Sequence, residues 1–152
     1  KEQIIATNQY KKILLESRIF LNENNFFKKK DYKISFEIVS IFLIMFIRIN
    51  LSEYNRKLYT KVNDELLSLF ISDLDESLRE KGIGDMSIGK YVKSYVKKFY
   101  FRISKFPDDN NLYNNKAFIE YLKVTNLIKN KEYINVSRKF NDKFVDFINS
   151  TN

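Results

Sequence analysis

The sequence predicts an all-α protein, a single-domain bundle of about six helices. Apolar residues recur at helical spacing along most of the chain, and no segment shows the strict alternation that is typical of strands. All three glycines and the single proline lie between residues 82 and 107, and no low-complexity linker divides the 152 residues. Because the hydrophobic content of 44% is enough for a buried core, we expect one domain over residues 1–152.

The first part of the chain contains two predicted helices. The first covers Asn8–Leu21, and one face of it contains Tyr10, Ile13, Leu14, Ser17 and Leu21. A basic connector, Lys28–Lys30, leads to Ser35, which can cap a second helix over Phe36–Ile49. That helix is apolar nearly all round, which is typical of a central buried helix. Its most apolar run has about 12 residues, whereas a membrane-spanning helix needs about 20.

The longest predicted helix covers Glu53–Lys81, with Ser52 as its cap. Its apolar stripe contains Leu58, Val62, Leu66, Leu69, Phe70, Leu74 and Leu78. Gly82 stands where a helix end favours a left-handed residue, a conformation that glycine adopts at low cost. A tight turn is therefore predicted over Gly82–Met86.

A strongly basic helix is predicted after this turn, over Ile88–Phe106, with Ser87 as its cap and Pro107 closing it. Asp85 lies just before it, where a helix N-terminus favours a carboxylate. Its apolar face contains Ile88, Tyr91, Val92, Tyr95, Val96, Phe99, Ile103 and Phe106. Its other face contains Lys90, Lys93, Lys97, Lys98, Arg102 and Lys105. A helix with this division is expected to bury one side and to expose the other.

Two weaker helical patterns follow the loop that begins at Pro107. One predicts a helix over about Asn115–Asn130, and the other predicts a last amphipathic helix from about Asn135. The apolar positions of the last helix are Val136, Phe140, Phe144, Phe147 and Ile148.

The absence of histidine and cysteine excludes several classes of site. The chain can form no Ser-His-Asp triad, no Cys-His pair, no zinc–thiolate site and no disulfide. We therefore expect that the protein is not an enzyme and that it holds no cofactor and no metal ion.

Two charged motifs resemble ligand sites but are better explained structurally. Residues 84–90 fit the front of a phosphate-binding loop, but Tyr91 replaces the Ser or Thr that would hold magnesium, and the segment follows a helix instead of a strand. Five carboxylates could be imagined as a cation site: Asp73, Asp75, Glu76, Glu80 and Asp85. Carboxylates on a helix surface usually face water, and Arg79 and Lys81 lie among them, so we expect no bound metal.

A resemblance to a known family rests on the residues around the turn. The segment DLDESLREKGIGDMSIGKYVKSYVKKFYFRI resembles the signature of the ubiquinol–cytochrome c chaperone family. The matching positions are Asp73, Asp75, Leu78, Arg79, Glu80, Gly82, Gly84, Asp85, Ile88, Lys90, Phe99, Tyr100 and Arg102. Phe101 departs from the pattern, where the family usually has glycine. The family's usual histidine is missing from the apolar helix, near Ser40 or Ile41. Weaker similarity extends from about Tyr10 to Tyr121.

The resemblance implies a chaperone that holds newly made cytochrome b during assembly of respiratory complex III. It implies protein partners, namely cytochrome b or other complex III components and a small co-chaperone or the ribosome. It also implies a location peripheral to the inner membrane, on the mitochondrial matrix side or, in a bacterium, on the cytoplasmic face. It further implies that the turn formed by Arg79, Glu80, Gly82, Gly84 and Asp85 determines shape and does no chemistry.

The basic helix provides the candidate partner surface. With a net charge of +8, the chain favours anionic partners, although a solvated basic face explains the lysines equally well. The candidate partner-binding residues are Lys90, Lys93, Lys97, Lys98, Phe99, Tyr100 and Arg102. An apolar groove formed by Phe99, Tyr100, Ile103 and Phe106 is expected beside a rim of Lys93, Lys97 and Arg102. Two alternatives stay open: a module that binds RNA or the ribosome directly, and a structural subunit of a respiratory or ribosomal assembly.

Overall fold

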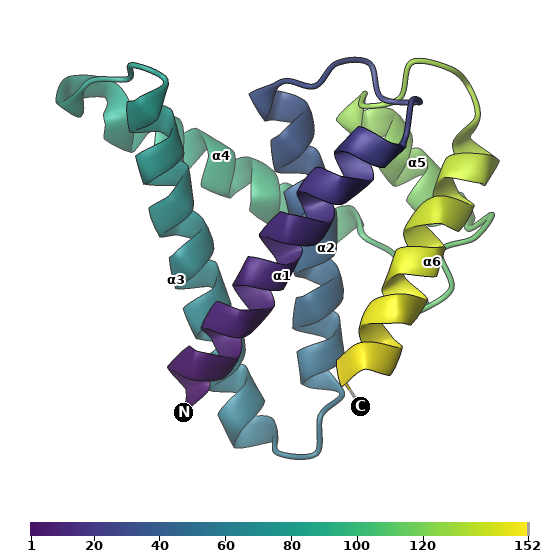
Figure 1. The fold of residues 1–152 in the computed structure, drawn as a ribbon, viewed down its shortest axis with the longest axis horizontal. Coiled ribbons are helices and arrows are strands. Elements are labelled where there is room, and N and C mark those ends of the chain that lie inside the picture. The colour runs from purple at the N-terminus through teal and green to yellow at the C-terminus, as the bar shows by residue number, and fades with distance from the viewer. Residues whose placement is uncertain (152) are drawn as a thin grey trace.

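The chain folds into helices joined by short connections (Figure 1). The computed structural model describes residues 1–151, and within them six helices are formed. They are α1 (Glu2–Glu23), α2 (Tyr32–Leu51), α3 (Arg56–Glu80), α4 (Asp85–Lys105), α5 (Lys116–Thr125) and α6 (Tyr133–Thr151). The predicted all-α class is confirmed.

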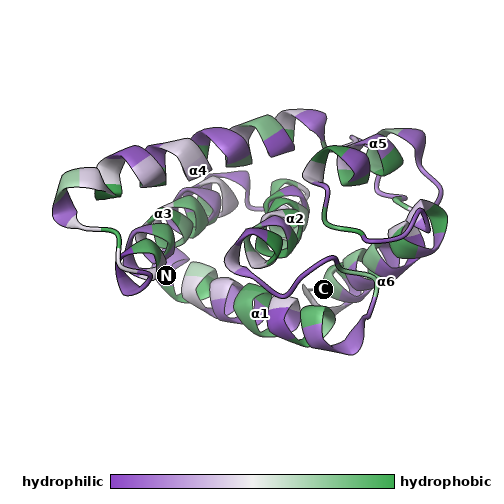
Figure 2. Cartoon of the chain, turned by 90° about the horizontal axis from the view of Figure 1, so that it is seen from above, coloured by the Kyte–Doolittle hydropathy of each residue, from purple (hydrophilic) through white to green (hydrophobic). Residues whose placement is uncertain are grey.

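The core is built around α2. Seen from above, α2 and α3 lie between α1 on one side and α4 on the other, and α5 and α6 close one end (Figure 2). Residues on every side of α2 are buried because its sequence is apolar nearly all round. Its fully buried residues include Ile38, Ile41, Phe42, Leu43 and Met45. The predicted role of this segment as the central helix is therefore confirmed.

The length of α2 differs from the prediction. It has 20 residues and, by length and composition alone, is apolar enough to cross a membrane. However, 72% of its most apolar stretch is buried inside the fold, and the core helix of a soluble protein has the same composition. The fold therefore uses α2 as a packing element.

Three predicted helix caps are wrong. Asp31 caps α2, and its carboxylate accepts a hydrogen bond from the Ile34 N–H at 3.0 Å. Asn55 caps α3 in the same way, through the Leu58 N–H at 3.1 Å. Asp and Asn cap helices as well as serine does, and each stands close to the serine that was predicted. The predicted caps Ser35 and Ser87 lie inside α2 and α4, whereas Ser52 ends α2.

The end of α5 also differs from the prediction. The helix ends at Thr125 because Asn126 adopts a left-handed conformation with φ of 55°, which asparagine tolerates better than most residues. The following residues pair with the segment after α1: the Lys28 N–H donates to the Leu127 carbonyl, and the Lys129 N–H donates to the Phe26 carbonyl, both at 2.9 Å. This pairing places the basic connector beside the end of α5.

Candidate functional site

The α3–α4 turn fixes the start of the basic helix. Gly82 has φ of 96°, in the left-handed region that was predicted for it. Its N–H donates to the Arg79 carbonyl at 3.0 Å, and the Ile83 N–H donates to the Leu78 carbonyl at 3.1 Å. These two bonds form a Schellman motif, which satisfies the last carbonyls of α3. Gly84 is the N-cap of α4 and is extended, with φ of −80°.

Charged side chains brace this turn. The Arg79 guanidinium donates to the Asp75 carboxylate at 2.7 Å and also to the Asp85 carboxylate. These two hydrogen bonds raise the pKa of Arg79. Glu80 is exposed at the end of α3. Arg79 therefore joins the two helices across the turn.

One face of α4 is basic and open to solvent. Lys90, Lys93 and Lys97 recur at three- and four-residue spacing and are exposed. No carboxylate of residues 1–151 lies within 4.0 Å of their ammonium groups. The same face continues into two aromatic residues, Tyr100 and Phe101, which are 52% and 47% exposed. Positive charge and exposed aromatic surface are thus adjacent on one helix.

Two of the candidate partner-binding residues lie inside the protein. Phe99 is 1% exposed and packs on Phe70, with ring centroids 4.9 Å apart. Arg102 is 7% exposed, so the expectation that it lies on an accessible basic rim is wrong. Its side chain points inward and contacts the carboxylate of Glu37 on α2.

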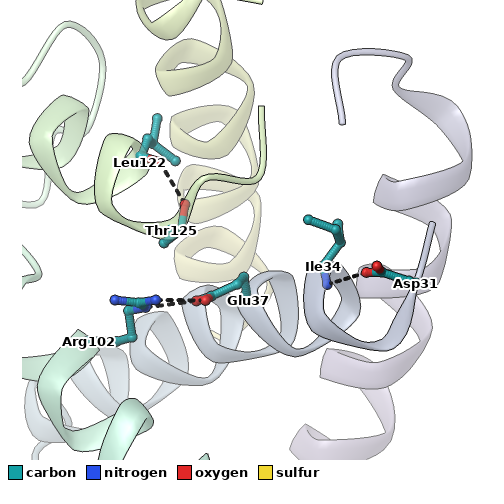
Figure 3. A network of polar contacts seen from close by, with 6 residues as sticks. All are labelled: Asp31, Ile34, Glu37, Arg102, Leu122 and Thr125. Atoms are coloured by element: carbon teal, nitrogen blue, oxygen red, sulfur yellow. Dashed lines mark hydrogen bonds and ion pairs between the residues drawn. The ribbon is translucent and has the colours of Figure 1, made fainter. Parts of the chain in front are cut away.

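The Arg102–Glu37 pair is the main polar contact between α4 and α2. The Arg102 Nε and Nη2 atoms donate to the two Glu37 carboxylate oxygens, both at 2.8 Å (Figure 3). Both side chains are less than one-tenth exposed. These hydrogen bonds raise the pKa of Arg102, so it stays charged. The pair therefore joins the second half of α4 to the first half of α2.

The predicted apolar groove forms only in part. Phe99 and Phe106 are buried in the core. Ile103 lines a small hollow with a volume of about 110 Å³, together with Ile44, Ile47, Arg48 and Leu51 of α2. Leu51 is half exposed, at 50%. The accessible apolar surface near α4 is therefore shared with the end of α2, which the sequence pattern did not indicate.

The two motifs that resemble ligand sites have structural roles. Residues 85–90 belong to α4, so the glycine-containing segment is helical and forms no loop that could cradle a phosphate. Asp73 of the acidic cluster accepts a hydrogen bond from the Tyr10 hydroxyl at 2.6 Å. Within residues 1–151, no group of three or more histidine, cysteine or carboxylate side chains could hold a metal ion.

Two departures from the family pattern lie in different surroundings. Ser40 and Ile41 are both fully buried, and the Ser40 hydroxyl has no hydrogen-bond partner among the described residues. Phe101 is half exposed and lies under the Lys105 ammonium, 5.5 Å from its ring centroid. The first change therefore affects the core, and the second enlarges the exposed aromatic surface of α4.

Sequence reasoning missed Glu37 as the buried partner of Arg102. One signal could have found it, since Glu37 is the single carboxylate of a helix that is apolar nearly all round. A buried carboxylate of this kind requires a partner of opposite charge, and the basic helix after the turn contains several candidates for that partner.

Comparison with known protein families gives a match. The model of a family described as Ubiquinol-cytochrome C chaperone matches residues 29–108. This range contains α2, α3, the turn and α4, and therefore both halves of the Arg102–Glu37 pair. Comparisons with curated proteins and with solved structures give no match.

Proposed function

Because the chain belongs to the ubiquinol-cytochrome C chaperone family, we propose that it is a non-enzymatic assembly factor that holds cytochrome b during assembly of complex III. Family membership indicates a chaperone role in complex III assembly and implies protein partners. We further propose that its client is cytochrome b and that it catalyses no reaction. We place it at the matrix side of the inner membrane or, in a bacterium, at the cytoplasmic face of that membrane.

The exposed face of α4 is the observation on which the proposal rests. Lys90, Lys93 and Lys97 have no carboxylate partner among the described residues, and Tyr100 and Phe101 continue the same face. Unpaired surface charges attract a partner of opposite sign and speed its encounter. Exposed aromatic side chains supply contact area at low entropic cost, as they do in many interfaces.

In this proposal, the two parts of the face have different tasks. The lysines attract acidic residues of the client or of a co-chaperone, and the aromatic residues cover apolar surface that the client would otherwise expose. The hollow beside Ile103 gives an apolar side chain of the client a place to insert. Binding by such a surface needs no reactive group, which agrees with the absence of histidine and cysteine.

A charge-reversal experiment tests the proposal. The triple variant Lys90→Glu, Lys93→Glu, Lys97→Glu changes only exposed positions of α4, so we expect it to fold. We expect recovery of cytochrome b with the purified variant to fall at least tenfold, and recovery with the parent protein to fall as salt is raised.

The control reverses three exposed charges on other helices, Lys11, Arg18 and Lys139. It should recover cytochrome b as the parent does. Equal recovery with both triple variants would assign the basic face of α4 to solvation and refute the proposed surface. Recovery of ribosomal RNA without any complex III component would favour the RNA-binding alternative.

A further inference from the structure

A second and larger hollow lies between the start of α2, the C-terminal part of α4 and the end of α5. Its volume is about 480 Å³, which lies within the range of small-molecule sites. Among the lining residues that Figure 3 labels, Glu37, Arg102 and Thr125 each come from a different helix. The backbone pairing of Lys28 with Leu127 brings the basic connector against the end of α5, and both segments line the hollow.

The lining of this hollow is strongly basic. Its five cationic side chains are Lys28, Lys29, Lys33, Lys98 and Arg102, against two carboxylates, Asp31 and Glu37. Both carboxylates are already engaged: Asp31 caps α2, and Glu37 is held at both oxygens by Arg102. Among the described residues, none of the four lysines has a carboxylate within 4.0 Å. The hollow therefore has a positive charge that the protein itself leaves unmatched.

Contacts within the protein and the start of α2 favour the positions and the charge of these lysines. The Lys98 ammonium lies 5.6 Å from the ring centroid of Tyr95 and 6.0 Å from that of Phe36, and such cation–π contacts favour this position. The Lys28 ammonium donates to the Asn126 side-chain oxygen. Lys33 lies in the first turn of α2, where the positive end of the helix dipole adds to the local potential.

We propose that this hollow binds a phosphate group, either that of a small organic phosphate or that of a phospholipid headgroup. A site for planar carboxylates normally uses the paired N–H groups of an arginine. Here the Arg102 Nε and Nη2 atoms already donate hydrogen bonds to Glu37, so the positive groups left for a ligand are lysine ammonium groups. Lysine binds phosphate as a point charge. This proposal does not depend on the chaperone role, because it rests on the charge and volume of the hollow alone.

The test compares two variants with equal loss of charge. One removes hollow lysines, Lys29→Gln, Lys33→Gln and Lys98→Gln, and the other removes exposed lysines of α4, Lys90→Gln, Lys93→Gln and Lys97→Gln. Glycerol 3-phosphate is titrated into each folded protein by calorimetry at low salt. Sedimentation with phosphatidylcholine vesicles, with and without phosphatidylglycerol, forms the second arm.

We expect the hollow variant to bind glycerol 3-phosphate at least tenfold more weakly than the parent, and the α4 variant to stay within twofold of it. Loss of vesicle sedimentation in the hollow variant alone would identify a phospholipid headgroup as the source of the phosphate. Binding of the soluble compound without sedimentation would identify a small organic phosphate. Equal weakening in both variants, no binding by the parent, or tighter binding of a glutamate peptide in the hollow would overturn the proposal.

Discussion

Removing the charge of Glu37 should destabilise the fold more than removing any exposed carboxylate. Glu37→Gln keeps the shape of the side chain but leaves the Arg102 guanidinium buried without a counter-charge. Breaking a buried ion pair from one side costs about 3–5 kcal/mol. Because the pair borders a hollow that opens to solvent, we expect the lower end, about 3 kcal/mol. For a chain of this size, that lowers the melting temperature by about 6–12 °C.

Urea unfolding followed by circular dichroism at 222 nm measures this cost. The control is Asp75→Asn, which breaks the exposed contact with Arg79 and should leave the urea midpoint close to that of the parent. The double variant Glu37→Met, Arg102→Met leaves neither member of the pair as a buried, unpaired charge. Its loss of stability should therefore be smaller than the sum of the losses in the single variants Glu37→Met and Arg102→Met. If Glu37→Gln unfolds at the same urea concentration as Asp75→Asn, the pair does not hold α4 on α2.

Two further predictions concern the turn and the buried tyrosines. Gly82→Ala should lower the free energy of unfolding by roughly 1–2 kcal/mol, because Gly82 has φ of 96°. Gly89→Ala lies inside α4 with open space around it and should raise the free energy of unfolding by about 0.5–1 kcal/mol. Equal urea midpoints for the two variants would contradict the left-handed turn. Burial raises the pKa of Tyr32 to about 12 and raises the pKa of Tyr10 and Tyr121 further, so the unfolded chain loses its tyrosine protons first. Stability should be complete below about pH 10 and fall as the pH rises above it, as followed by urea unfolding and by absorbance at 295 nm; a constant urea midpoint from pH 9 to pH 12 would refute this.

The features that could be predicted from the sequence are those with a local cause. The apolar periodicity of α2 and α3 arises within single helices, and the left-handed position of Gly82 follows from the helix that precedes it. The exposure of Lys90, Lys93 and Lys97 likewise follows from their spacing on one helix. Each of these features can be derived without knowing which helices pack against one another.

The features that were missed depend on contacts between distant segments. Arg102 shares the basic pattern of α4, but its side chain turns inward because Glu37 lies opposite, 65 positions away in the chain. The larger hollow depends on the pairing of Lys28 with Leu127, two residues that no periodic pattern connects. Helix ends were missed for another reason: Asp31, Asn55 and nearby serines are all good caps, and only packing selects among them.

Site-specific photo-crosslinking in cells that assemble complex III tests the proposed client surface most directly. A photoreactive residue replaces Tyr100, on the exposed face of α4, or Val145, which is 44% exposed on α6. We predict that the α4 position crosslinks to cytochrome b and that the α6 position does not. Crosslinks to cytochrome b from Val145 alone, or none from either position while the protein is folded and complex III is being assembled, would contradict the account.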